Sequence, residues 1–184
     1  VGGDMGKRTL VLRLVLGAVL EAAWCRAADA SSAPATAALP ELVFCTRARY
    51  TDGHWYANIG YYCDDAAKKA YAGNGKPDVG VLYRYNPATR DKRVLFDAKG
   101  GGVRDPHVDY DGATILFSHR PAGTDYYHLY QIRSDGTGLR QLTGGPWDDY
   151  EPCRLPDGDI AFVSTRCKRW VSCWYTQVGT LHRC

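Results

Sequence analysis

Two segments of this 184-residue chain match each other without a gap at a spacing of 46 residues. One runs from Asp105 to Arg120 and the other from Glu151 to Arg166. A period in the mid-forties, with Asp-Gly turns and short β-branched or aromatic runs, is typical of a β-propeller blade, in which each repeat is a four-stranded sheet. The repeat therefore predicts an all-β fold. The matched positions are Pro106/Pro152, Asp111/Asp157, Gly112/Gly158, Ser118/Ser164 and Arg120/Arg166, and the charge is kept at Asp105/Glu151.

The rest of the chain predicts about three blades of antiparallel strands, at residues 41–104, 105–150 and 151–184. The central blade is complete, with strands expected at 106–108, 114–118, 127–132 and 139–143. The first begins at 42–47, which resembles 160–166 and therefore corresponds to the second strand of a blade; a hairpin of 80–85 and 93–96 follows. The last blade reaches a strand at 174–182. Since a propeller ring needs roughly four to eight blades, the sequence predicts an incomplete β-propeller.

The first 30 residues have the layout of a secretory signal peptide. Lys7 and Arg8 precede an apolar stretch that ends at Leu20, and small residues follow at 28–30. Residues 1–30 are therefore predicted to be upstream residues and a signal peptide, and the Ala-, Ser- and Pro-rich residues 31–40 a linker. A signal peptide predicts a periplasmic or otherwise extracytoplasmic location. Because the apolar stretch is too short to span a membrane, no stable membrane span is expected after cleavage. The alternative is an amphipathic helix packed on the domain.

Cysteine usage also suggests an oxidising compartment. Cleavage after Ala30 would remove Cys25 from the seven cysteines and leave six (7 − 1), an even number. Six cysteines allow 15 pairings, among which sequence alone cannot choose. Proximity along the chain favours the disulfides Cys167–Cys173, Cys45–Cys63 and Cys153–Cys184. No C-x-x-C pair occurs, so no metal site is predicted.

Four acidic residues occupy the links between expected blades, where propellers usually bind ligands. They are Asp105, Asp148, Asp149 and Glu151. Carboxylates that converge near a channel could bind a cation or a basic ligand, because oxygen ligands suit hard metals. The alternative is structural: these carboxylates cap turns or pair between blades with Arg104, Arg120 and Arg166.

His107 and an aromatic insertion are two further candidates for binding. His107 stands where the next repeat has Cys153, and could ligate a metal or haem of a neighbouring domain or simply pack. The insertion, residues 48–79, is too long and too aromatic for a plain linker. Its aromatic side chains make it the best candidate for binding a partner, unless it packs on itself. These side chains are Trp55, Tyr56, Tyr61 and Tyr62.

Several classes of activity lack support in the sequence. A formal charge of +3 without a basic cluster argues against nucleic acid. The G-x-S-x-G motif of α/β-hydrolases and the phosphate-binding glycine patterns are missing. Ser118 and Ser164 recur as repeat elements, which favours bonding to backbone over nucleophilic attack. We therefore predict no catalytic residue in this chain.

Four sequence stretches carry a family resemblance, two to each of two groups of proteins. Asp157-Gly158 with 160–166, and Asp135 to Thr143, resemble the WD40-like repeat of TolB-type propellers. Residues 102–112 and 148–158 are similar to exported bacterial proteins related to the middle domain of the hydrazine synthase alpha subunit. Full members of that group attach c-type haem through C-x-x-C-H, which is missing here, so no cofactor is expected in this stretch and haem is possible only in other domains.

The resemblance implies an exported, non-catalytic propeller scaffold or binding module, whose partner is another protein or other domains of the same chain. One alternative is the middle domain of a multihaem redox protein of the hydrazine synthase alpha type. Another is the propeller of a serine peptidase whose catalytic domain lies elsewhere.

Overall fold

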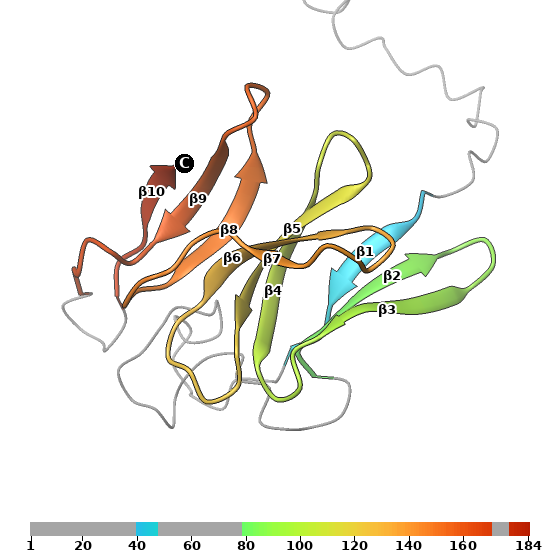
Figure 1. The fold of residues 1–184 in the computed structure, drawn as a ribbon, viewed down its shortest axis with the longest axis horizontal. Coiled ribbons are helices and arrows are strands. Elements are labelled where there is room, and N and C mark those ends of the chain that lie inside the picture. Colours follow the sequence, from blue (N-terminus) through green and yellow to red (C-terminus); the bar gives the residue numbers. More distant parts are fainter. Residues whose placement is uncertain (1–39, 48–78, 171–176) are drawn as a thin grey trace, which may run out of the picture. The chain divides into compact units, whose positions relative to one another are not determined.

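A computed structural model describes residues 40–47, 79–170 and 177–184, which form antiparallel sheets (Figure 1). The first sheet has the order β1-β2-β3, the central sheet β4-β5-β6-β7 and the third sheet β10-β9-β8. The all-β class predicted from the repeat is confirmed. The strands are β1 (Leu42–Cys45), β2 (Val81–Asn86), β3 (Asp91–Asp97), β4 (Gly102–Val108), β5 (Thr114–Arg120), β6 (His128–Arg133), β7 (Arg140–Gln141), β8 (Asp149–Arg154), β9 (Ile160–Ser164) and β10 (Thr180–Arg183).

The central sheet has the four strands expected of one repeat, and the expected hairpin is β2–β3. The strand predicted over 174–182 is corrected in its described part, 177–182: β10 begins only at Thr180, and Gln177 makes an isolated bridge to Trp170. Residues 171–176 lie outside the described residues. Alternation of apolar residues in the sequence could not show that the pairing of β10 with β9 starts at Thr180 in the described part of this stretch.

The apolar core lies in two clusters, on either side of β5. One cluster joins Leu82 of the first sheet to Ile115 and Phe117. The other joins Leu116 to Phe162 of the third sheet. Because β5 has packed neighbours on both faces, all its residues from Ile115 to Arg120 are buried. Each large apolar side chain buried in this way contributes about 1.5–3 kcal/mol to stability.

The two Asp-Gly pairs of the repeat form the turns before β5 and β9. Gly112 and Gly158 have φ of 65° and 95°, a region in which glycine is not strained. The Asp111 carboxylate accepts hydrogen bonds from the backbone N–H of Ala113 (2.8 Å) and Thr114 (2.9 Å). These bonds favour the charged carboxylate and lower the pKa of Asp111. The repeat thus specifies local turn geometry.

The strands that precede these turns, β4 and β8, share an irregularity. Their pairing shifts register between Arg104 and His107 in β4 and between Tyr150 and Cys153 in β8. Within each shift, Asp105 and Glu151 have the same φ of 54°. Left-handed backbone costs a non-glycine residue about 1–2 kcal/mol, and a following proline also disfavours it. Its recurrence in both repeats indicates that surrounding contacts hold it in place.

Candidate functional site

The predicted acidic residues Asp105 and Glu151 lie where the central and third sheets meet, beside Arg104. Arg104 is only 2% exposed. Its Nε donates to Asp105 Oδ2 at 2.5 Å, and its Nη2 donates to Glu151 Oε1 at 3.2 Å. One buried guanidinium therefore binds the equivalent carboxylates of two successive repeats.

The Asp105 carboxylate also bonds to the backbone of the next repeat. Its Oδ2 accepts from the N–H of Glu151 at 3.3 Å and from Ser118 Oγ at 3.4 Å. The Ser118 hydroxyl oxygen in turn accepts from the same N–H at 3.2 Å. Ser118 thus contributes to a contact between sheets, whereas the equivalent Ser164 accepts hydrogen bonds from the backbone N–H and the Nε of Arg166.

Burial opposes the charge of Arg104, but its neighbours more than compensate. The Asp105 and Glu151 carboxylates raise the pKa of Arg104 although burial alone would lower it. The guanidinium also lies over the Tyr150 ring, 4.8 Å from its centre. Such cation–π contacts are worth about 2 kcal/mol when desolvated. The junction of the two sheets is thus a charged but well-compensated contact.

Asp148, another predicted site residue, is 1% exposed in the link before β8. Its Oδ1 accepts from the backbone N–H of Tyr127 at 2.7 Å, and its own N–H donates to Thr165 Oγ1 at 2.9 Å. Within the described residues, its Oδ2 has no hydrogen-bond partner. Burial raises the pKa of Asp148 to about 6, because the charged form loses its hydration.

The pKa of Asp149 is shifted in the opposite direction from that of Asp148, although Asp149 is also fully buried. Burial alone would raise its pKa, but hydrogen bonds to its carboxylate, including that from Arg166 Nη2 at 2.9 Å, lower it overall. His128 Nδ1 lies 3.9 Å from the other carboxylate oxygen, too far for a strong hydrogen bond. Asp149 therefore acts as a paired structural carboxylate.

His107 points at the third sheet from the far end of β4. Its Nε2 accepts from the backbone N–H of Arg154 at 3.2 Å. Next to this bond, Arg154 Nε donates to Asp109 Oδ2 at 2.8 Å, and the Tyr110 hydroxyl donates to the Arg154 carbonyl at 3.2 Å. Histidine at this position links two sheets, and the equivalent Cys153 is exposed.

The structure describes four of the six cysteines that take part in the predicted disulfides. Cys45, Cys153, Cys167 and Cys184, the cysteines that the structure describes, form no disulfide with one another. Cys153 pairs with Ala161, and Cys184 exchanges two backbone hydrogen bonds with Ile160, so β9 lies between them. Two strand spacings are about 10 Å, beyond the roughly 7 Å Cα–Cα limit of a disulfide, and the Cys153–Cys184 bond is not formed. Cys63 and Cys173 lie outside the described residues, as do Trp55, Tyr56, Tyr61 and Tyr62.

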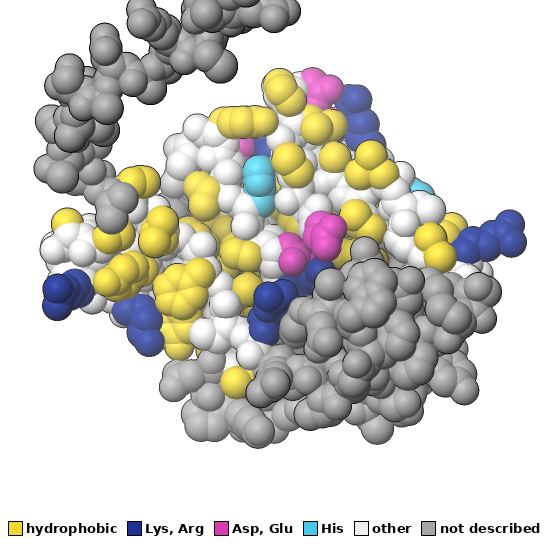
Figure 2. Space-filling model, turned by 180° about the vertical axis from the view of Figure 1, so that it is seen from behind, with side chains coloured by type: hydrophobic (Ala, Val, Ile, Leu, Met, Phe, Trp, Pro, Cys, Tyr) yellow, Lys and Arg dark blue, Asp and Glu magenta, His cyan; other side chains and the backbone are white. Residues whose placement is uncertain are grey.

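No three His, Cys, Asp or Glu side chains gather as metal ligands in the part of the chain that the structure describes. The described residues also include no helix long and apolar enough to cross a membrane. Hydrophobic side chains are distributed over the face shown in Figure 2, with charged side chains between and around them.

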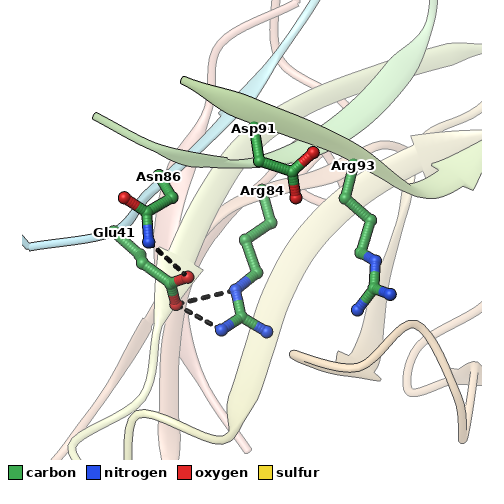
Figure 3. Close-up of a pocket in the computed structure, with 5 residues that line it drawn as sticks. All are labelled: Glu41, Arg84, Asn86, Asp91 and Arg93. Carbon is green, nitrogen blue, oxygen red and sulfur yellow. Dashed lines mark hydrogen bonds and ion pairs between the residues drawn. The ribbon is translucent and has the colours of Figure 1, made fainter. Parts of the chain in front are cut away.

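A polar hollow in the first sheet was not predicted from the sequence. It has a volume of about 110 Å³ (Figure 3). The signal was present in the predicted hairpin, because antiparallel pairing of β2 with β3 puts Arg84 opposite Arg93. Its lining residues are Glu41, Arg84, Asn86, Asp91 and Arg93.

Comparison with known proteins adds a likeness of fold. No family model matches the chain, and no curated protein matches it. Among solved structures, it is similar to Kuenenia stuttgartiensis hydrazine synthase, with a TM-score of 0.50 and 17% sequence identity over 67% of this chain. The match spans 18% of that protein's chain. The chain thus has an all-β fold that resembles part of hydrazine synthase.

Proposed function

We propose that this chain is part of an exported β-propeller that serves as a non-catalytic scaffold or protein-binding module. The observation that carries the proposal is the bond from the Glu151 N–H to the Asp105 carboxylate, which joins equivalent positions of two repeats. A repeat that binds its successor in this way can be extended by further repeats with the same contact. Stacking of repeats in succession is how repeat folds bury their sheet faces.

The chemistry at the sheet junction supports a scaffold more than an active site. Asp105, Glu151 and Ser118 all bond to Arg104 or to backbone, and the carboxylates keep Arg104 charged. A nucleophile or general base needs a partner that activates it and open access to substrate. Here the same groups are committed to holding two sheets together. The partner is accordingly proposed to be another protein, or other domains of the same chain, in an extracytoplasmic compartment.

A second candidate is the middle domain of a hydrazine synthase alpha-like multihaem protein. The similarity of fold to part of hydrazine synthase favours it. In that case the three sheets would position haem domains that lie in other parts of the protein. The sheets themselves would still act as a scaffold.

Both candidates can be tested on the protein expressed from its own gene in a bacterium that matures c-type cytochromes. We expect recovery from the periplasm with residues 1–30 removed, and crosslinking mass spectrometry should map a reproducible protein neighbour onto the sheets. Covalent haem in the absorption spectrum of the reduced pyridine complex would favour the second candidate. Retention of the protein in the cytoplasm would contradict the proposal of an exported scaffold. Catalytic activity that depends on side chains within residues 41–184 of the purified protein would also contradict it.

A further inference from the structure

The hollow in the first sheet is lined entirely by polar side chains. They come from β2, β3 and the residue preceding β1 (Figure 3). Two are arginines and two are acids, so the formal charge of the lining is zero. Such a hollow suits a small charged ligand better than an apolar one.

Arg84 and Arg93 are direct cross-strand partners, and their side chains project from the same face of the sheet. Like charges placed directly opposite each other destabilise an antiparallel pair. Glu41 neutralises one of them: its Oε2 accepts from Arg84 Nε at 2.7 Å and also from Arg84 Nη2. Arg84 Nη1 donates in addition to the carbonyl of Ser134 at 3.3 Å. Arg84 is therefore held in place with its charge compensated.

Arg93 has no such compensation. Within the described ranges, neither the Arg93 guanidinium nor the Asp91 carboxylate takes part in a hydrogen bond or ion pair. The two residues stand two positions apart on β3, about 7 Å between Cα atoms for extended backbone. In Figure 3 the Arg93 side chain extends away from the Asp91 carboxylate. The hollow thus offers one unpaired charge of each sign.

This arrangement selects for a ligand with both charges. A simple anion at Arg93 would also approach Asp91 and Glu41, and a simple cation at Asp91 would approach Arg84 and Arg93. A ligand with a carboxylate and an ammonium close together satisfies both unpaired groups. Arginine binds carboxylates through two parallel hydrogen bonds, and a carboxylate such as Asp91 accepts from an ammonium.

We propose that the hollow binds a small zwitterion of the α-amino-acid class. Arg93 binds its carboxylate and Asp91 accepts hydrogen bonds from its ammonium. The Glu41–Arg84 pair forms the opposite wall and keeps Arg84 from competing for Asp91. The proposed contacts involve only the carboxylate and the ammonium of the ligand. Glycine, which carries both groups and has no side chain, is therefore the appropriate first probe.

The experiment is a titration of the intact, ¹⁵N-labelled chain with glycine, followed by NMR. Glycine should shift the side-chain Nε–Hε resonance of Arg93 and the amide resonances of β3 in a saturable manner. Arg93→Gln and Asp91→Asn should each weaken binding roughly tenfold or more, as expected when a hydrogen bond to a charged group is lost. Lys92→Gln is the matched control. It removes a charge from the same strand on the face that contacts Tyr83, and should leave binding unchanged.

Acetate and methylammonium separate the zwitterion from simpler ligands. Each carries one of the two charges and should bind much more weakly than glycine. If acetate binds as tightly as glycine, the hollow is an anion site and the proposal is wrong; equal binding of methylammonium overturns it likewise. Absence of any saturable shift, in a chain whose spectrum shows folded sheets, would also overturn it. Arg93→Lys, which keeps the charge but loses the two-pronged contact, should bind with intermediate strength.

Discussion

The carboxylate of Asp105 accepts a hydrogen bond from the backbone N–H of Glu151, the residue that occupies its own position in the next repeat, at 3.3 Å. Both residues have φ of 54° and precede a proline. The strained backbone aims the N–H of Glu151 at the central sheet, and the Asp105 side chain receives it. A locally unfavourable conformation is thus stabilised by contact between sheets.

The two residues should differ in what their side chains contribute. Asp105→Ala removes one of the two acceptors of the Glu151 N–H, the other being Ser118 Oγ, and it removes the nearest counter-charge of buried Arg104. We therefore expect a loss of about 2–4 kcal/mol. Glu151→Ala is the matched control, because Glu151 has the same φ and also precedes a proline, but its side chain is 48% exposed. Its loss of stability should be smaller than that of Asp105→Ala by about 1 kcal/mol or more. Urea unfolding of both variants measures the difference. Equal losses would mean that the carboxylate of Asp105 has no special role.

Asp148 should make stability depend on pH. Its pKa is raised to about 6 from 3.8, so between these values the folded chain holds a proton that the unfolded chain has lost. Stability from this group therefore falls as pH rises through about 4 to 6 and stays low above 6, by up to about 3 kcal/mol. Asp148→Asn keeps an oxygen for the Tyr127 N–H and should be more stable than the parent at pH 7.5 but not at pH 4.5.

Denaturant unfolding across this pH range tests the assignment to Asp148. Asp149→Asn provides a contrast of opposite sign, because hydrogen bonds lower the pKa of Asp149 and its charge stabilises the fold at neutral pH. This variant should lose stability at pH 7.5 and lose less at low pH. Parallel pH profiles for the parent and Asp148→Asn would show that folding does not raise the pKa of Asp148.

Gly101 should not tolerate any side chain. A Cβ there would lie 2.3 Å from the carbonyl oxygen of Arg120 and 3.0 Å from the backbone N of Ala122. Because both obstacles are backbone atoms, Gly101→Ala should shift the start of β4 and cost about 2–4 kcal/mol. Gly144→Ala, where the nearest atom is a side-chain nitrogen at 3.7 Å, is the control and should be within about 0.5 kcal/mol of the parent. Thermal unfolding distinguishes them; equal midpoints would refute the steric argument.

The cysteines give a covalent test. Mass spectrometry of the exported protein without reduction should find Cys167 linked to Cys173 and no link between Cys153 and Cys184, which β9 separates. A peptide that joins Cys153 to Cys184 would mean that β10 does not pair with β9 as described. Free thiols at Cys167 and Cys173 would remove the argument for an oxidising compartment.

Much of the fold could be predicted because its determinants are local. The Asp111-Gly112 turn needs only a carboxylate that accepts nearby N–H groups and a glycine with positive φ. The hairpin β2–β3 and the strand β5 follow from alternation and apolar runs. The strand expected up to His182 was wrong over residues 177–179, because whether a segment pairs depends on the neighbouring strand as well as on its own residues.

The sequence by itself determined the repeat, the all-β class, the Asp-Gly turns and the acidic residues at equivalent positions. Only the tertiary structure decided what those acids do: Asp105 and Glu151 share Arg104, while Asp148 is buried with a raised pKa. It also decided that β9 separates two cysteines and that Arg84 faces Arg93 beside a hollow. The physical reason is the separation along the chain over which each interaction acts. Turn and strand preferences act between neighbours in the chain, whereas charge pairing and burial depend on side chains that meet across sheets from distant segments.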